Sequence, residues 1–200
     1  MSSHLQAAIE LLTSSDSTAR MEAAAEIYRL GCAAAEQAVR EWLENAELGA
    51  LLLTPKAVVT VGLAVKRETF SRIRVTHGTP RLSEVPPDQD AEEFELQLDD
   101  GVSLDILTSR EPGGNGAIAK YLAKHGEGIQ QVEYQCLDVD RAVGLLREQF
   151  RKSPVYPEAR AGADGTRVNF FLVAIADGSK VLIELYETPR PPSPSTRSAH

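Results

Sequence analysis

The chain has 200 residues, enough for one ordinary domain with a substantial core. Its 21 basic and 29 acidic residues give a net charge of −8, which argues against nonspecific nucleic-acid binding because such binding depends on Lys and Arg neutralising phosphates. The longest largely apolar run, 57–65, is too short to span a bilayer, the N-terminus lacks a secretory signal pattern, and Cys32 and Cys136 suit buried thiols, so we expect a cytoplasmic protein without a membrane partner.

The segment 1–54 is predicted to be helical, because it is rich in Ala, Leu and Glu and poor in β-branched residues. Apolar residues recur at helical spacing in stretches that begin near Leu5, Met21 and Ala35. We interpret Gly31 as a helix C-cap that separates the second stretch from the third. The resulting pair, STARMEAAAEIYRLGCAAAEQAVREWL, resembles a single HEAT-like repeat. Because a lone repeat cannot bury its own face, we expect it to pack on the following domain or on a second subunit.

From residue 57 onward the pattern favours strands. The run AVVTVGLAV places Thr60 on a face of small residues and valines on the other face. The segments AEEFELQL and VSLDILT then alternate as the two arms of a hairpin, with Glu93 and Asp105 on their polar faces. A short helix, AIAKYLAKH, follows, with Asn115 as its expected cap and a stop at the next glycine.

The second half of the chain repeats this order of elements. The strand GIQQVEYQCLD carries Gln131 and Glu133 on one face. Because buried polar groups need partners, we interpret this polar row as the wall of a pocket, with a plain exposed face as the alternative. An amphipathic helix, DVDRAVGLLREQF, precedes the hairpin RVNFFLVAIADGSKVLIELYE, whose last strand carries Glu184. The tail, 189–200, is rich in Pro and Ser and is predicted to be disordered.

These two units form an internal repeat, each ending in a strand with a lone acid, LDIL in the first and LIELY in the second. The segments LDILTSREPGGNGAIAKYLAKHGEGIQQVEY, DGTRVNFFLV and VLIELYE resemble the vicinal oxygen chelate superfamily, the glyoxalase and bleomycin-resistance group, and within it the methylmalonyl-CoA epimerases. The resemblance covers 57–188. It implies an α+β fold in which two tandem βαβββ modules, 57–112 and 127–188, form a cupped eight-stranded sheet behind the small helical segment.

The resemblance also implies a divalent metal, Mn, Mg, Co or Zn, on the concave face of the sheet. By position its ligands would be Thr60, Asp105, Gln131 and Glu184. The histidines that usually serve as ligands in the family are missing at these positions, which leaves oxygen donors and removes the nitrogen donors that suit Zn and Co. The alternative is a metal-free network in which Gln131 and Thr60 hold Glu184 and Asp105 by hydrogen bonds.

Glu93 falls at the position of the catalytic acid of the epimerases, which is the general base of that family. Epimerisation needs a base that removes an α-proton and an electrophile that stabilises the enolate. The alternative interpretation of Glu93 is a carboxylate on an exposed strand. The resemblance thus implies a small-molecule pocket for an acyl thioester or a 2-oxo or carboxylate ligand, with acid–base isomerisation at an α-carbon, in a homodimer. A catalytically inactive, metal-free binding protein of the same fold is the alternative.

Overall fold

The structure is a computed structural model that describes residues 3–53, 57–98, 101–176 and 178–189. The helices are α1 (Ser3–Leu11), α2 (Ser17–Glu44), α3 (Ala46–Leu51), α4 (Arg67–Thr76), α5 (Ala117–His125), α6 (Val139–Phe150) and the short 3₁₀ helix η2 (Ala163–Gly165). The strands are β1 (Val59–Ala64), β2 (Glu92–Gln97), β3 (Ser103–Thr108), β4 (Gly128–Gln135), β5 (Arg160–Ala161), β6 (Arg167–Ala174) and β7 (Lys180–Glu187).

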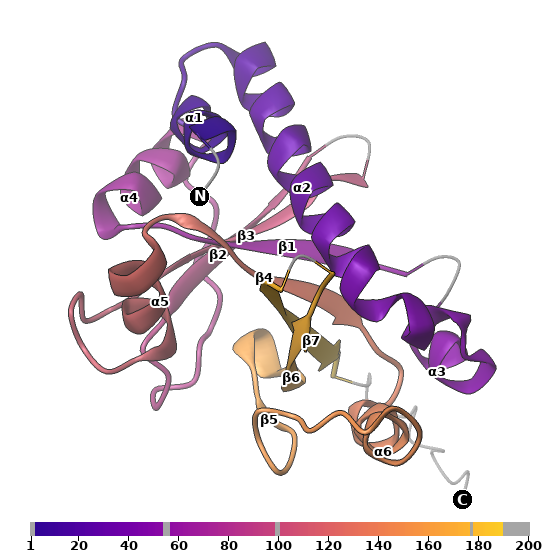
Figure 1. The fold of residues 1–200 in the computed structure, drawn as a ribbon. Coiled ribbons are helices and arrows are strands. Elements are labelled where there is room, and N and C mark those ends of the chain that lie inside the picture. The colour runs from indigo at the N-terminus through magenta and orange to yellow at the C-terminus, as the bar shows by residue number, and fades with distance from the viewer. Residues whose placement is uncertain (1–2, 54–56, 99–100, 177, 190–200) are drawn as a thin grey trace, which may run out of the picture.

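The strands form one curled, mixed sheet in the order β2-β3-β1-β4-β7-β6-β5 (Figure 1). At its centre β1 and β4 run antiparallel. Each of them has a parallel neighbour from its own half of the chain, β3 beside β1 and β7 beside β4. Each parallel neighbour then pairs with an antiparallel strand further out, β2 in one half and β6 in the other. The predicted α+β class with a curved sheet is therefore confirmed.

The described residues form seven strands and not the eight that we expected. The additional strand would lie between α4 and β2. There the Ser83 N–H donates to the Glu93 carbonyl oxygen at 3.0 Å, but no strand forms. Prolines at 80, 86 and 87 explain this difference, because a proline has no N–H to donate to a neighbouring strand.

The two faces of the sheet differ in the way that the alternating sequence predicted. One face is apolar and packs with α1, α2, α4 and α6 in a single core, while the opposite face carries the polar side chains. The strand residues that are fully buried in this core are Val61, Leu63, Phe94, Leu104, Ile106, Val132, Phe171, Ile183 and Leu185.

Helix α2 is one continuous helix of 28 residues that lies across the sheet (Figure 1). It passes through Gly31, so the predicted C-cap at Gly31 and the HEAT-like helix pair are wrong. A Cβ on Gly31 would lie 2.6 Å from both Cγ atoms of Val61, so the glycine serves a close approach of helix to strand. Near the other end of α2, Trp42 is 1% exposed and meets the Phe171 ring edge-on at 5.6 Å. The helical segment therefore packs on the sheet of its own chain.

The sequence predicted the C-terminal end of α5 correctly and its N-cap wrongly. Gly126 ends the helix with φ 74°, as the sequence predicted. The N-cap is Gly116 and not Asn115. A Cβ on Gly116 would lie 2.4 Å from the Asp90 Oδ2 atom, so a side chain at this cap would collide with that carboxylate. Asp90 is in turn fixed by the Ser109 hydroxyl, which donates to Oδ2 at 2.6 Å.

Some predictions fall outside the described residues. These are the boundary between the two predicted domains at 54–56 and the tail from 190 onward. The division into a helical segment and a sheet domain stays a prediction, although both contribute to one core. Of the helices that the structure describes, none has the length and apolar character needed to cross a membrane.

Candidate ligand-binding and active site

A cavity of about 690 Å³ lies on the polar face of the sheet. Its floor is formed by strands, and its sides by α5 and by the segments that precede β2 and β6. All the residues predicted for the site line this cavity, and each comes from a different strand: Thr60 from β1, Glu93 from β2, Asp105 from β3, Gln131 from β4 and Glu184 from β7. The structure thus brings the predicted residues together, while their chemical roles stay predictions.

Gln131 lies at the centre of a hydrogen-bonded group on the cavity floor. Its Nε2 donates to Glu184 Oε2 at 2.6 Å and to Glu133 Oε1 at 3.0 Å. The first of these bonds belongs to the metal-free network that the sequence suggested. The other predicted bond, between Thr60 and Asp105, is replaced by a different one. The Thr60 hydroxyl is hydrogen-bonded to the Ser103 hydroxyl at 3.1 Å.

Asp105 is the most isolated carboxyl of the floor. It is 8% exposed, and no donor among the described residues forms a hydrogen bond with it. Burial raises the pKa of Asp105 well above its ordinary value, and the nearby charges of Glu93, Glu133 and Glu184 raise it further. Asp105 is therefore held neutral at pH values where an exposed aspartate is ionised.

Glu93 and Glu133 have pKa values close to neutrality. Burial raises the pKa of Glu93 to about 7, with a further contribution from Asp164 and an opposing one from Arg110. Burial also raises the pKa of Glu133 to about 8, against the hydrogen bond from Gln131. Side chains with such pKa values can both accept and release protons at neutral pH.

Glu184 shares this environment. Burial is the main cause that raises its pKa well above the ordinary value, and the charges of Glu133 and Glu93 add to it. The carboxyls of four strands therefore influence one another's protonation across a common space.

Sequence reasoning missed Gln130 as a residue of the site. The pairing of β1 with β4 shifts from Gly62 opposite Gln131 to Leu63 opposite Ile129, which marks a β-bulge at Gln130. The bulge lets Gln130 line the cavity beside its neighbour, and the Gln130 Oε1 atom is buried without a hydrogen-bond partner among the described residues. Strict alternation assigns neighbouring residues to opposite faces, so no sequence signal revealed it.

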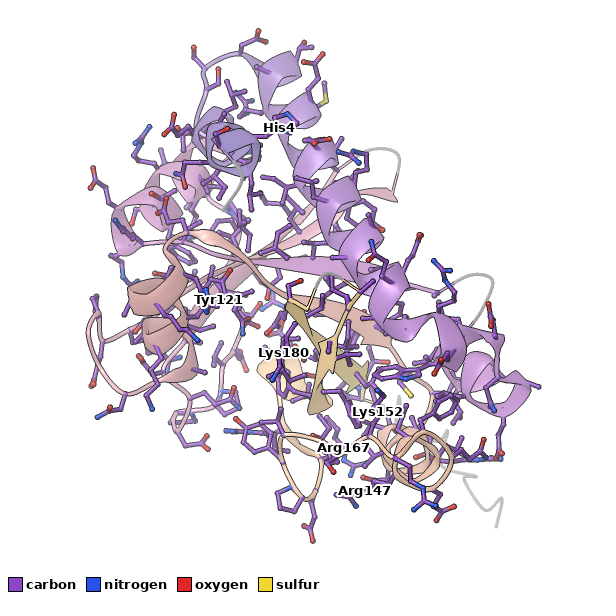
Figure 2. The ribbon with its side chains drawn as sticks, viewed as in Figure 1. His4, Tyr121, Arg147, Lys152, Arg167 and Lys180 are labelled. Atoms are coloured by element: carbon purple, nitrogen blue, oxygen red, sulfur yellow. The ribbon has the colours of Figure 1, made fainter. Side chains whose placement is uncertain are left out.

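Helix α5 is anchored next to this bulge. The Tyr121 hydroxyl donates to the Ile129 carbonyl oxygen at 2.7 Å, and Tyr121 is labelled in Figure 2. Ile118 of the same helix lines the cavity. The helix that the family-like central motif predicted therefore forms one side of the site.

Two contacts between the two halves of the chain involve residues that line the cavity, Gln89 and Asp164. Arg81 donates to both carboxylate oxygens of Asp164, at 3.1 and 2.7 Å. The Gln89 amide donates to the Ala161 carbonyl oxygen at 2.7 Å, so a second contact joins the same two segments. These residues had no role in the sequence-based predictions, because nothing in the sequence places 81 beside 164.

Two of the four residues predicted as metal ligands form other hydrogen bonds in this arrangement. Gln131 turns its Nε2 toward Glu184, and the Thr60 hydroxyl is engaged with Ser103. Throughout the described part of the chain, no group of three or more His, Cys, Asp and Glu side chains is placed to hold a metal. The geometry instead resembles a hydrogen-bonded floor of carboxyl and amide groups.

Among the comparisons with known proteins, the one with solved structures finds similar proteins. No protein-family model and no curated protein matches the chain. Among solved structures, methylmalonyl-CoA epimerase from Mycobacterium tuberculosis is 31% identical with a TM-score of 0.55, and the match covers 71% of this chain and 96% of that one. A variant of Streptomyces coelicolor methylmalonyl-CoA epimerase in complex with 2-nitronate-propionyl-CoA is 26% identical with a TM-score of 0.52, and the match covers 66% of this chain and 96% of that one.

A third structure, methylmalonyl-CoA epimerase in complex with methylmalonyl-CoA and NH4+, is 27% identical with a TM-score of 0.52, over 68% of this chain and 96% of that one. In each case nearly the whole of the solved chain is matched. The sequence motifs, the curled sheet and these similarities agree. The chain belongs to the vicinal oxygen chelate superfamily, among its methylmalonyl-CoA epimerase-like proteins.

Proposed function

We propose that this protein moves a proton at a carbon next to the carbonyl group of a small acyl thioester or 2-oxo compound, with Glu93 as the base. The observation that carries the proposal is the environment of Glu93. Its carboxyl lines the cavity, and its pKa is raised to about 7. A base with a pKa near the working pH is the most effective one for proton abstraction.

The remaining groups of the floor supply the other parts of such a reaction. When Glu93 takes the α-proton, the electrons of the C–H bond form the enolate, whose charge develops on the carbonyl oxygen. Asp105 is kept protonated by its raised pKa and can donate a hydrogen bond to that oxygen. Glu133, with a pKa of about 8, is protonated at neutral pH and can return a proton to the carbon.

Two similar structures support the choice of substrate class. They are epimerases in complex with 2-nitronate-propionyl-CoA and with methylmalonyl-CoA, which are both acyl thioesters. A cavity of about 690 Å³ has the size that such a group needs. A divalent metal at Thr60, Asp105, Gln131 and Glu184 stays a prediction of the family resemblance, and no step of the proposed reaction passes through it.

The proposal is tested by hydrogen exchange at the α-carbon. Methylmalonyl-CoA is incubated with the full chain in D₂O, and deuterium incorporation is followed by NMR. We expect Glu93→Gln to lower the exchange rate by about 100- to 10,000-fold, the usual contribution of a general base. Glu148→Gln is the matched control, because Glu148 is an exposed residue of α6 outside the cavity. Equal exchange by the wild type and Glu93→Gln would show that Glu93 is not the base.

A second candidate function is the binding of a small molecule without chemistry. The hydrogen bonds from Gln131 to Glu184 and Glu133 favour it, since a satisfied floor of this kind can serve a pocket alone. An absence of α-proton exchange in the wild type, together with a melting temperature that rises on addition of a small ligand, would favour this function.

We also propose a cytoplasmic location and a duplicated fold. The location is supported by Cys32 and Cys136, which are both free thiols. The matching strand pairings in the two halves support two related modules, the first of which forms one strand fewer among the described residues. The homodimer stays a prediction of the resemblance.

A further inference from the structure

We propose that Leu107 and Ile118 hold a short alkyl branch on the reacting carbon of the substrate and select substrates by the length of that branch. The inference rests on the proposed function for the position of the reacting carbon, and it goes further by assigning residues to substrate selection. Three observations carry it: an apolar cluster on the cavity face of the sheet, its place beside Glu93 and Asp105, and the small surface that it shows to the cavity.

A small apolar cluster lies on the same face of the sheet as the cavity. Its buried members are Ala64 of β1, Leu107 of β3 and Ile118 of α5, and it is separate from the main core. Leu107 and Ile118 also line the cavity. Tyr121 packs against the cluster, and its hydroxyl donates to the Ile129 carbonyl oxygen at 2.7 Å, which fixes α5 over the strands. The two cavity-lining side chains therefore have defined positions.

Leu107 lies next to the groups that the proposed reaction uses. It is directly opposite Glu93 in the pairing of β2 with β3, so the two side chains point to the same face. Asp105 is two residues earlier on β3 and points to that face as well. On the side of β1, a Cβ on Gly62 would lie 3.1 Å from the Leu107 Cδ1 atom and 2.5 Å from the Gln131 Cγ atom. The leucine thus has the proposed base on one side and the polar floor on the other.

This arrangement gives an alkyl branch an apolar place beside the reacting carbon. In the proposed reaction that carbon presents its hydrogen to Glu93 and its carbonyl group to Asp105, so a further substituent lies near both residues, where Leu107 is. An alkyl group is stabilised when it leaves water for an apolar surface. The hydrogen-bonded groups of Gln131 and Glu133 are a poor place for it, because polar groups covered by an alkyl group lose water without gaining a partner.

The small size of the apolar surface favours a short branch. Leu107 is 3% exposed and Ile118 is 7% exposed, so each shows only a small part of its side chain to the cavity. Ala91, which packs against the same cluster and also lines the cavity, adds a single methyl group. A methyl branch can be covered by this surface, whereas a longer branch would extend from it over the carboxyl groups of the floor. Differences of this kind between alkyl groups are what a closely fitting apolar surface discriminates.

The experiment compares two thioesters that differ only in the branch. Methylmalonyl-CoA and propylmalonyl-CoA are each given to the full chain, α-proton exchange in D₂O is followed by NMR, and binding is measured by calorimetry. We expect the wild type to exchange methylmalonyl-CoA at least about tenfold faster and to bind it more tightly, since one methylene in an apolar pocket discriminates by about 10- to 200-fold. Leu107→Ala should lower this preference by about tenfold, because the shorter side chain makes room for the longer branch.

Two further variants make the test specific. Ala91→Leu adds apolar bulk at a partly buried position of the same cluster and should raise the preference for the methyl branch by about tenfold. This variant also keeps the test decisive if Leu107→Ala does not fold. Leu172→Ala is the matched control, because it removes the same atoms from an exposed residue outside the cavity, and it should keep the preference of the wild type.

Equal exchange and equal binding of the two thioesters by the wild type would overturn the inference. A preference that neither Leu107→Ala nor Ala91→Leu changes would also overturn it. Calorimetry separates this inference from the proposed function, because it needs no reaction. Binding with the expected preference but without α-proton exchange would refute the reaction alone. Exchange with a preference that does not respond to the variants would refute this inference alone, and binding of neither thioester would refute both.

Discussion

Gly31 and Gly62 set two close contacts of the central strand β1. A Cβ on Gly62 would lie 2.5 Å from the Gln131 Cγ atom, so this glycine makes room for the amide that holds Glu184. On the opposite face, Gly31 of α2 makes room for Val61. Residues without a side chain thus determine both where the helix packs and where the polar group of the floor lies.

Replacing Gly31 by alanine should destabilise the fold. The added Cβ would come within 2.6 Å of the Val61 Cγ atoms, and overpacking of this kind costs about 1–3 kcal/mol of the free energy of unfolding. Gly144→Ala is the matched control, because a Cβ at this position in α6 meets open space and should stabilise the helix by about 0.5–1 kcal/mol. Urea denaturation measures both. A Gly31→Ala variant as stable as Gly144→Ala would contradict the close packing of α2 on β1.

The residues of the floor show what alternation can and cannot predict. The period of two placed Thr60, Asp105 and Gln131 on the cavity face, and the structure agrees. Glu133 was placed on that face as well, but its burial and its raised pKa depend on strands that are distant in sequence. Gln130 was missed because a bulge shifts the register by one residue.

Helix α2 is the element by which the N-terminal segment joins the core. Its buried residues share one cluster with the apolar face of the sheet, and its acidic and basic residues face outward. Sequence periodicity identified the helical content correctly. It wrongly predicted that a helix ends at Gly31. A glycine ends many helices, but it also permits close packing in the middle of a helix. Only the position of Val61 shows that Gly31 has the second role.

Trp42→Ala tests whether α2 is part of the core. Trp42 is 1% exposed and packs edge-on against Phe171 of β6, so its truncation should lower the free energy of unfolding by about 3–5 kcal/mol. Glu41→Ala is the control, because Glu41 is the exposed neighbour of Trp42, and it should change the free energy of unfolding by less than about 0.5 kcal/mol. A small loss in Trp42→Ala, measured by chemical denaturation, would mean that the helix packs on the sheet only loosely.

At the scale of the whole molecule, the carboxyls of the floor couple stability to pH. Their pKa values are raised in the folded chain, to about 7 for Glu93 and about 8 for Glu133. Between the ordinary pKa of a glutamate and these values, the folded state binds more protons than the unfolded state. The free energy of unfolding must therefore decrease as pH rises through this window.

We expect the protein to be more stable at pH 5.5 than at pH 8.5. Each additional proton held by the folded state contributes a slope of about 1.4 kcal/mol per pH unit to the free energy of unfolding. Glu133→Gln removes one of these groups and should flatten the dependence between pH 5.5 and 8.5. Urea denaturation at several pH values measures the slope, and stability that increases toward pH 8.5 would show that these carboxyls are not buried in the folded state.

The contacts between the two halves beside the cavity have a consequence for how the site forms. Arg81 and Asp164 are 83 positions apart, and Gln89 and Ala161 are 72 apart. Because long stretches of backbone must lose their freedom before such distant pairs can meet, we expect these contacts to form late during folding. We therefore expect a growing or truncated polypeptide that lacks the last third, and with it β6 and β7, to have no assembled cavity.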